Sequence, residues 1–243
     1  MAMIPTTPKR KSGWYTATEV KQHCTPGDCW ITLLGSVYDV TNLVTRNPAF
    51  LGKLLIHAGG GDISHWFDPS TGSVKRHIDP VSKQELFHTP EGRFVHVPPR
   101  APRTDWDSSF EFEWWNDPKY MIGKLSKRTR CIRVKNVLIN QDILLEVPCE
   151  ETVGQILDRY KDYNSHADSY SCRAVSLSDA HEFIQLDLNK TLQCNGVPDI
   201  SDIDEFPPPI KEKLIYEYLG SGLPAYFYVP VILIYYNDDL TIA

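Results

Sequence analysis

The sequence has no apolar segment long enough to cross a bilayer. Its longest apolar run, residues 223–236, contains fourteen residues and two prolines, whereas a membrane-spanning helix needs about 20 apolar residues in a row. We interpret this run as a strand. The N-terminal sequence MAMIPTTPKRKSGW is basic but is not followed by an apolar segment. We therefore expect no secretory signal, a reducing cytosol and six cysteines present as thiols.

Motifs of several enzyme classes are also missing. The chain has no G-x-S-x-G elbow, no P-loop, no G-x-G-x-x-G and no H-E-x-x-H, which are the motifs of acyl transfer, phosphate binding, dinucleotide binding and zinc hydrolysis. The Gly59-Gly60-Gly61-Asp62 run lacks the Lys-Ser/Thr of a phosphate loop, so we interpret it as a turn that ends a helix. No basic stripe with interleaved aromatic residues is present. We expect a protein that is not an enzyme and binds neither nucleic acid nor membrane.

Charge is divided unevenly along the chain. Residues 1–130 contain 17 Lys/Arg and 13 Asp/Glu, a net of +4, whereas residues 131–243 contain 8 and 18, a net of −10. With 42% hydrophobic and 23% charged residues among 243, the composition is that of a folded globular protein. Two domains with different surfaces are the simplest explanation.

Strand and helix patterns alternate in the first half. Residues 30–34 and 37–40 predict a tight hairpin. Thr41-Asn42 follows as a predicted helix cap, and residues 43–67 predict short helices that are broken at Pro48 and at the glycine run. Short helices joined by glycine turns often surround a pocket.

The second half has a different pattern. Residues 131–139 and 143–147 predict a second hairpin with its turn at residues 140–142. An amphipathic helix follows, because apolar residues recur with helical spacing at Val153, Ile156, Leu157 and Tyr160. Short strands are predicted at CRAV, FIQLDL and VPVILIYY.

A domain boundary is predicted near a segment rich in tryptophan. Residues 98–120 hold four prolines without a regular period, together with Trp106, Trp114 and Trp115. We expect a connector that docks on a surface, since three exposed tryptophans would be an unusual apolar load. The predicted division is a first domain at residues 14–100, the connector at 101–123 and a second domain at 124–243, with an acidic, proline-rich insertion near 199–222.

The first domain resembles the haem-binding domain of the cytochrome b5 family over roughly residues 14–80. The residues that carry the resemblance are Tyr15-Thr16-Ala17-Thr18-Glu19-Val20, Asp28-Cys29-Trp30-Ile31, Gly35-x-Val37-Tyr38-Asp39-Val40-Thr41, Ala58-Gly59-Gly60-Gly61-Asp62 and Phe67. In that family two histidines, one on each wall of an apolar cleft, fill both axial positions of the haem iron.

Only one of these two histidines has a counterpart here. The position of the first is occupied by Asn47, and an amide is a poor iron ligand. His77, ten residues after Phe67, is the best candidate for an axial ligand of haem b, and His57 and His65 are weaker candidates. The alternatives are a haem held by one histidine, a domain that keeps the fold without haem and, third in order, a soluble electron carrier.

Cys24 and Cys29 lie close together in the sequence beside His23. A zinc site would require a second pair of cysteines at comparable spacing, and the other four cysteines are scattered singly. Of the two alternatives, a redox-sensitive thiol is favoured over a metal site.

The second domain resembles a ubiquitin-like β-grasp in the order of its elements. The segment ILLEVPCEETVGQILDRY spans a strand and the helix, Lys190-Thr191-Leu192 and Pro198 fit the segment before the last strand, and VPVILIYY would be that strand, central and apolar on both faces. The chain ends in NDDLTIA without Gly-Gly, so we expect a docking surface and no conjugation through a C-terminal thioester. The expected fold class is α+β, with a cytochrome b5-like domain followed by a β-grasp domain.

Nearly the whole chain resembles the cytochrome b5 domain-containing protein 1 family. The motifs are YxxxEV, DCWIxLLGxVYDVT, AGGGDISHWFD, RHIDP, TPEGRFVHVPP, WW, NSHADSY and YYNDDL. The resemblance implies a structural and regulatory component of the ciliary or flagellar axoneme, with a haem-binding or redox-sensing role in the control of beating. It implies radial spoke and other axonemal proteins as partners, and a location in the cytoplasm, the cytoskeleton and the cilium.

Overall fold

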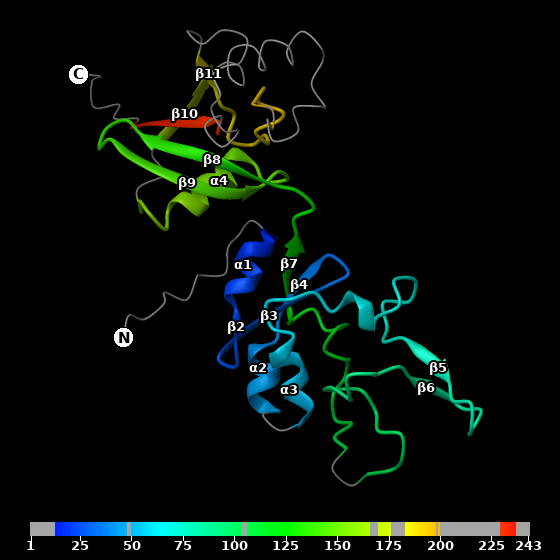
Figure 1. The fold of residues 1–243 in the computed structure, drawn as a ribbon. Helices are drawn as coiled ribbons and strands as arrows, with labels where there is room; N and C mark the ends of the chain where they lie inside the picture. Colours follow the sequence, from blue (N-terminus) through cyan, green and yellow to red (C-terminus); the bar gives the residue numbers. More distant parts are fainter. Residues whose placement is uncertain are drawn as a thin grey trace, which may run out of the picture. The chain divides into compact units, whose positions relative to one another are not determined.

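The computed structural model describes residues 13–47, 50–103, 106–165, 170–175, 183–197, 199 and 229–236 (Figure 1). These residues divide into two compact units, Gly13–Lys127 and the part from Arg128 onward, and each unit is described separately. The first unit contains helices and sheet, and the described part of the second contains the helix α4 and a sheet, so the predicted α+β class is confirmed. Among the described residues, no helix has the length and apolar character that a membrane span requires.

A five-stranded sheet forms the frame of the first unit. The strands lie in the order β1-β7-β4-β3-β2, with β1 and β7 parallel and the other pairs antiparallel. Their bounds are β1 Trp14–Tyr15, β2 Cys24–Thr25, β3 Asp28–Leu33, β4 Ser36–Asp39 and β7 Met121–Leu125. The predicted hairpin is confirmed as β3 and β4. Its turn has φ of 47° at Leu34 and 78° at Gly35, the left-handed pair whose twist matches that of the strands.

Short helices follow the hairpin, as predicted. The helices of this unit are α1 Ala17–Gln22, α2 Thr41–Arg46, α3 Phe50–His57 and the 3₁₀ turn η1 Ser64–Trp66. Pro48 itself lies outside the described residues. The cap predicted at Thr41-Asn42 is wrong: Thr41 is already the first residue of α2, and its backbone N–H donates to the Asp39 carboxylate at 3.1 Å. Its hydroxyl accepts a hydrogen bond from the Cys29 N–H at 3.0 Å. Thr41 therefore joins α2 to β3.

The glycine run after α3 is a turn that ends the helix, as predicted. The N–H of Gly59 donates to the Ile56 carbonyl at 3.1 Å and the N–H of Gly60 donates to the Trp30 carbonyl at 2.7 Å. Gly60 has a φ of 76°, a conformation that glycine adopts without the steric cost of a Cβ. The turn therefore folds the end of α3 back onto β3.

Trp114 and Trp115 belong to the core of the first unit and not to a connector. Both are buried, and their rings meet the Phe67 ring edge-on with centroids 6.3 and 5.6 Å apart. Strand β7 follows and pairs with β1 and β4. The structure therefore divides the chain after Lys127, and the boundaries predicted at residues 101 and 124 are corrected. The sequence around Trp114 and Trp115 has no helical or strand period, so it did not show that distant elements would bury these two side chains.

The second unit contains a five-stranded sheet whose topology is compatible with the predicted β-grasp. The order is β11-β10-β12-β8-β9, with β12 parallel to β8 and the other pairs antiparallel. The bounds are β8 Thr129–Asn136, β9 Gln141–Pro148, β10 Tyr170–Val175, β11 Phe183–Gln185 and β12 Val231–Tyr236. Strand β12 is central and buries Ile232 and Ile234, as its apolar sequence predicts.

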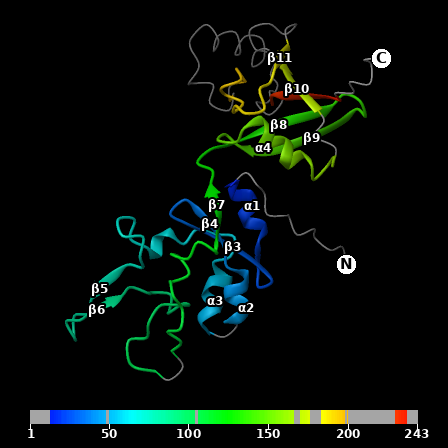
Figure 2. The same ribbon diagram turned by 180° about the vertical axis from the view of Figure 1, so that it is seen from behind.

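Helix α4, Val153–Tyr160, follows the hairpin of β8 and β9 (Figure 2). It begins with a capping box, in which Thr152 and Gln155 each accept a hydrogen bond from the backbone N–H of the other. The four positions predicted to be apolar and inward, Val153, Ile156, Leu157 and Tyr160, are all buried in the core of this unit. The amphipathic prediction is confirmed.

The turn between β8 and β9 lies earlier than predicted. It occupies residues 137–140, because the side-chain oxygen of Asn136 accepts hydrogen bonds from the N–H groups of Leu138 and Ile139 at 3.0 and 3.3 Å. An Asn side chain that accepts from the backbone two residues on is a common way to begin a turn. Apart from Asp199, the predicted insertion at 199–222 lies outside the described residues.

Candidate haem-binding site

Asn47 is the residue at the first ligand position. It ends α2, and its side-chain Nδ2 donates to the Leu43 carbonyl at 3.0 Å. Its backbone N–H donates to the carbonyls of Leu43 and Val44, both at 3.2 Å. A Cβ on Gly52 would overlap the Asn47 carbonyl, so α3 packs closely here. The Asn47 amide therefore helps to end α2 and does not act as an axial ligand.

His77 lies on a separate two-stranded ribbon formed by β5, Arg76–Ile78, and β6, Glu85–Phe87. It faces Leu86 in the register. Its Nδ1 is buried and has no hydrogen-bond partner. The ring of His88 lies edge-on to it, with centroids 5.5 Å apart. The coordinating capacity of this imidazole nitrogen is therefore not used by another protein group.

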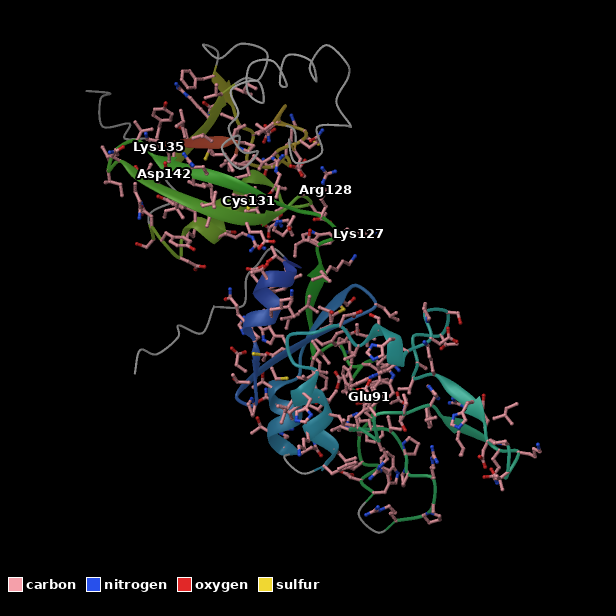
Figure 3. The ribbon with its side chains drawn as sticks, in the orientation of Figure 1. Glu91, Lys127, Arg128, Cys131, Lys135 and Asp142 are labelled. Atoms are coloured by element: carbon pink, nitrogen blue, oxygen red, sulfur yellow. The ribbon has the colours of Figure 1, made fainter. Side chains whose placement is uncertain are left out.

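The two weaker candidates are exposed. His57 is the last residue of α3, and His65 lies in η1, where its Nε2 is 3.5 Å from the Glu91 carboxylate. Glu91 is labelled in Figure 3. An exposed imidazole gives no apolar wall for a macrocycle. The structure does not place either residue as an axial ligand.

Asn47 and His77 do not form two facing walls. Strands β5 and β6 lie apart from α2 and α3 in both ribbon views (Figures 1 and 2). The imidazole that the structure does bring beside His77 is His88, which the sequence analysis missed. His88 comes there because it continues the β5 and β6 hairpin: its backbone N–H donates to the Lys75 carbonyl at 2.7 Å, and the register of the two strands, which the sequence does not show, brings it beside His77.

Aromatic rings fill the interior beside Phe67. Trp66 and Phe94 stack with centroids 5.1 Å apart, and Phe94 lies 6.2 Å from Phe67 and 6.0 Å from Trp115. The indole N–H groups of Trp114 and Trp115 are buried without a hydrogen-bond partner. Unpaired buried donors are costly, and a ligand with acceptor atoms would satisfy them.

Two opposed histidines do not fit the described residues, because the Asn47 amide stands at one of the two positions. No group of three or more His, Cys, Asp or Glu that could hold a metal ion occurs in the part of the chain that the structure describes. A single axial imidazole does fit, since His77 keeps a buried nitrogen without a partner. His77 would hold the iron, and haem bound there would supply redox or ligand-binding chemistry.

Comparison with known proteins assigns the family. A family model described as "Cytochrome b5-like Heme/Steroid binding domain" matches residues 16–89. "Cytochrome b5 domain-containing protein 1" of Xenopus laevis is 43% identical over 240 residues, which are 98% of this chain and 99% of that protein. The protein of the same name from Homo sapiens is 40% identical over 229 residues, 94% of this chain and 91% of that protein. The chain belongs to this family.

The cytochrome b5 domain-containing protein 1 family carries a cytochrome b5-like domain, and haem is the cofactor that this domain class implies. A shorter match, 34% identical over 58 residues, links 24% of the chain to 64% of the "Soluble cytochrome b558" of Ectothiorhodospira shaposhnikovii. The match to the domain model ends at residue 89, whereas the first unit continues to Lys127. The segment with Phe94, Trp114, Trp115 and β7 is therefore an addition to that domain.

Proposed function

We propose that the first unit binds haem b through His77 as its single axial histidine, and that the chain is a regulatory protein and not an enzyme. The observation that carries this proposal is the buried Nδ1 of His77 without a hydrogen-bond partner, in a domain of a haem-binding class. No second imidazole stands at the other ligand position, because that residue is Asn47, whose amide donates to the Leu43 carbonyl at the end of α2. An iron with one histidine keeps a further coordination position, which suits a sensor better than an electron carrier.

A titration of the purified chain with hemin tests this proposal. We expect a Soret band that saturates at one hemin per chain and that His77→Ala removes. The matched control is His57→Ala, which changes an exposed imidazole at the end of α3 and should leave the band unchanged. A band that survives in His77→Ala would overturn the ligand assignment. A low-spin bis-imidazole spectrum that His88→Ala also abolishes would favour an electron carrier.

A haem-free adaptor is the second candidate function. It is favoured by the contacts beside Phe67, where the rings of Phe94, Trp114 and Trp115 lie within 5.6–6.3 Å of its centroid. An interior packed in this way is stable without a cofactor. The same hemin titration separates the two functions, since an adaptor gives no Soret band under oxidising or reducing conditions.

The proposed setting is the axoneme of cilia or flagella, at the radial spokes, with a role in redox control of beating. The proposal is supported by membership of the family over 98% of the chain and by a second unit available for docking. Its net of −10 over residues 131–243 suits a basic partner. A tagged chain expressed in a ciliated cell should stay with the axoneme after detergent extraction and be lost from axonemes that lack spokes. Release with the detergent-soluble fraction would contradict this setting.

A further inference from the structure

Cys24 and Cys29 face each other across β2 and β3. They are direct partners in the antiparallel register. The neighbouring pair is hydrogen-bonded, with the Trp30 N–H donating to the His23 carbonyl at 2.9 Å, and the Cys29 N–H donates away from β2, to Thr41. The two cysteines therefore form a pair without ladder hydrogen bonds, in which Cα atoms lie about 4.5 Å apart and side chains share a face. A disulfide spans roughly 4.4–6.8 Å between Cα atoms.

The glycine turn after α3 lies against both cysteines. A Cβ placed on Gly59 would lie 3.1 Å from the Sγ of Cys29 and 3.3 Å from the Cα of Cys24. A Cβ on Gly60 would lie 3.3 Å from the Cβ of Cys24. Both cysteines thus pack against the same backbone turn, where a larger residue would be tightly confined. Because both atoms lie next to the Gly59 position, the Sγ of Cys29 is no more than 6.4 Å (3.1 + 3.3) from the Cα of Cys24, which is close enough for the two side chains of a facing pair to be joined.

The two thiols differ in exposure. Cys24 is exposed and Cys29 is buried, with its Sγ donating to the Leu55 carbonyl at 3.6 Å. Burial, with smaller contributions from Asp39 and Asp28, raises the pKa of Cys29 to about 12. Since the thiolate is the form that reacts with an oxidant, Cys29 is protected from direct attack. The first oxidation then falls on Cys24.

We propose that Cys24 and Cys29 form a reversible disulfide when the protein meets a peroxide. The Cys24 thiolate attacks one oxygen of hydrogen peroxide, the O–O bond breaks, and the released hydroxide takes a proton, so Cys24 becomes a sulfenic acid. The Cys29 sulfur then attacks the sulfenic sulfur and gives up its proton in the same step. Its place opposite Cys24 makes this attack intramolecular, which offsets its low fraction of thiolate. The S–S bond forms, and the hydroxyl leaves as water with the Cys29 proton. The two thiols lose two electrons and two protons, and the peroxide is reduced to two waters.

This modification needs no haem, so it stands independently of the function proposed above. A dithiol reductant reverses it by exchange, and a disulfide with one exposed sulfur is open to that attack. A peroxide-driven change at the β2 and β3 hairpin would act on the turn after α3, because that turn contacts both cysteines. The chain would then report peroxide through the covalent state of the first unit.

Peptide mapping of the full chain tests the proposal. Cleavage at Lys21 and Arg46 releases residues 22–46, which contain Cys24 and Cys29 and no other cysteine. After treatment with hydrogen peroxide and blocking with N-ethylmaleimide, this peptide should carry no label and be about 2 Da lighter than the reduced peptide. Dithiothreitol should restore both labels. The peptides with the other four cysteines should remain labelled throughout.

Two variants complete the design. Cys29→Ser should stop the reaction at the Cys24 sulfenic acid, which dimedone traps. The matched control is Cys131→Ser, which changes an exposed cysteine on β8 (Figure 3). Cys131 faces Glu146 in the register and not another cysteine, so this variant should form the Cys24–Cys29 cross-link as the parent does. The proposal is overturned if peroxide leaves both labels on the peptide, or if Cys24 goes only to a disulfide between chains or to a sulfinic acid.

Discussion

Arg159 and Glu151 form a two-point ion pair inside the core of the second unit. The guanidinium Nε lies 2.6 Å from one carboxylate oxygen and Nη2 lies 2.8 Å from the other, and the two side chains are 3% and 0% exposed. Glu151 precedes α4 and Arg159 lies in its last turn. The pair therefore connects the two ends of the helix in a region from which water is excluded.

Removing one partner of this pair should leave an uncompensated buried charge. We expect Arg159→Met to lower the free energy of unfolding by about 3–5 kcal/mol, and the double variant Glu151→Leu/Arg159→Met to recover much of that loss, since it buries neither charge. Denaturant unfolding of the full chain measures both. Lys190→Met removes an exposed pair with Asp187 and should change stability by about 1 kcal/mol or less. Equal losses in the single and double variants would contradict this account.

Trp30 is expected to contribute strongly to the stability of the first unit. Its ring stacks on His23 with centroids 3.5 Å apart and meets Tyr15 edge-on at 5.3 Å, so it joins β3 to the segment around α1. Trp30→Ala should lower the free energy of unfolding by about 3–5 kcal/mol through the cavity it leaves. Trp106→Ala, at a half-buried position, should cost less. If Trp30→Ala unfolds at the same denaturant concentration as the parent, the assigned core is wrong.

Local periodicity predicted much of the fold. The hairpin of β3 and β4, helix α4 and the central strand β12 were predicted because each buries a face whose residues repeat along a short stretch of chain. The turn after Asn136 was misplaced because an Asn side chain can begin a turn that its apolar neighbours, Val137 to Ile139, conceal.

Long-range contacts explain the rest. Trp114, Trp115 and β7 complete the first unit through partners more than 40 residues earlier, such as Phe67, and no local pattern announces them. The candidate ligand His77 was identified from its distance to Phe67, but its neighbour His88 depends on the pairing of β5 with β6. The facing of Cys24 and Cys29 likewise depends on the register of two strands.

Gly123 is expected to be required for the pairing of β1 with β7. A Cβ there would overlap the Gly13 carbonyl and would lie 2.7 Å from the Tyr15 ring. Gly123→Ala should lower the free energy of unfolding by about 1–3 kcal/mol, the usual cost of overpacking. Gly27→Ala is the matched control, because nothing lies within 4 Å of its Cβ position. Similar unfolding curves for the two variants would argue against the close approach.

His96 should make the stability of the first unit depend on pH. Its Nδ1 accepts a hydrogen bond from the backbone N–H of Trp114 at 2.9 Å, and its ring stacks on the Phe110 ring with centroids 4.0 Å apart. Burial, with a smaller contribution from Lys119, lowers the pKa of His96 below its ordinary 6.5. Between these two pKa values the unfolded chain binds more protons than the native one. The stabilising contribution of neutral His96 is therefore complete above about pH 6.5. It is lost as the pH falls from there through the lower pKa of the folded state.

His96→Asn isolates this effect. Asn tolerates the left-handed backbone at this position, where φ is 66°, and its side-chain oxygen can accept from the Trp114 N–H without titrating. The free energy of unfolding, measured in urea from about pH 7.5 to 5, should fall less in His96→Asn than in the parent. The pKa values of Asp107 and Asp117 are lowered mainly by hydrogen bonds from Ser109 and Lys119, and His96 is the smallest of the causes, so these carboxylates act at more acidic pH and nearly equally in the two proteins. Parallel pH profiles in the two proteins would show that His96 is not the titrating group.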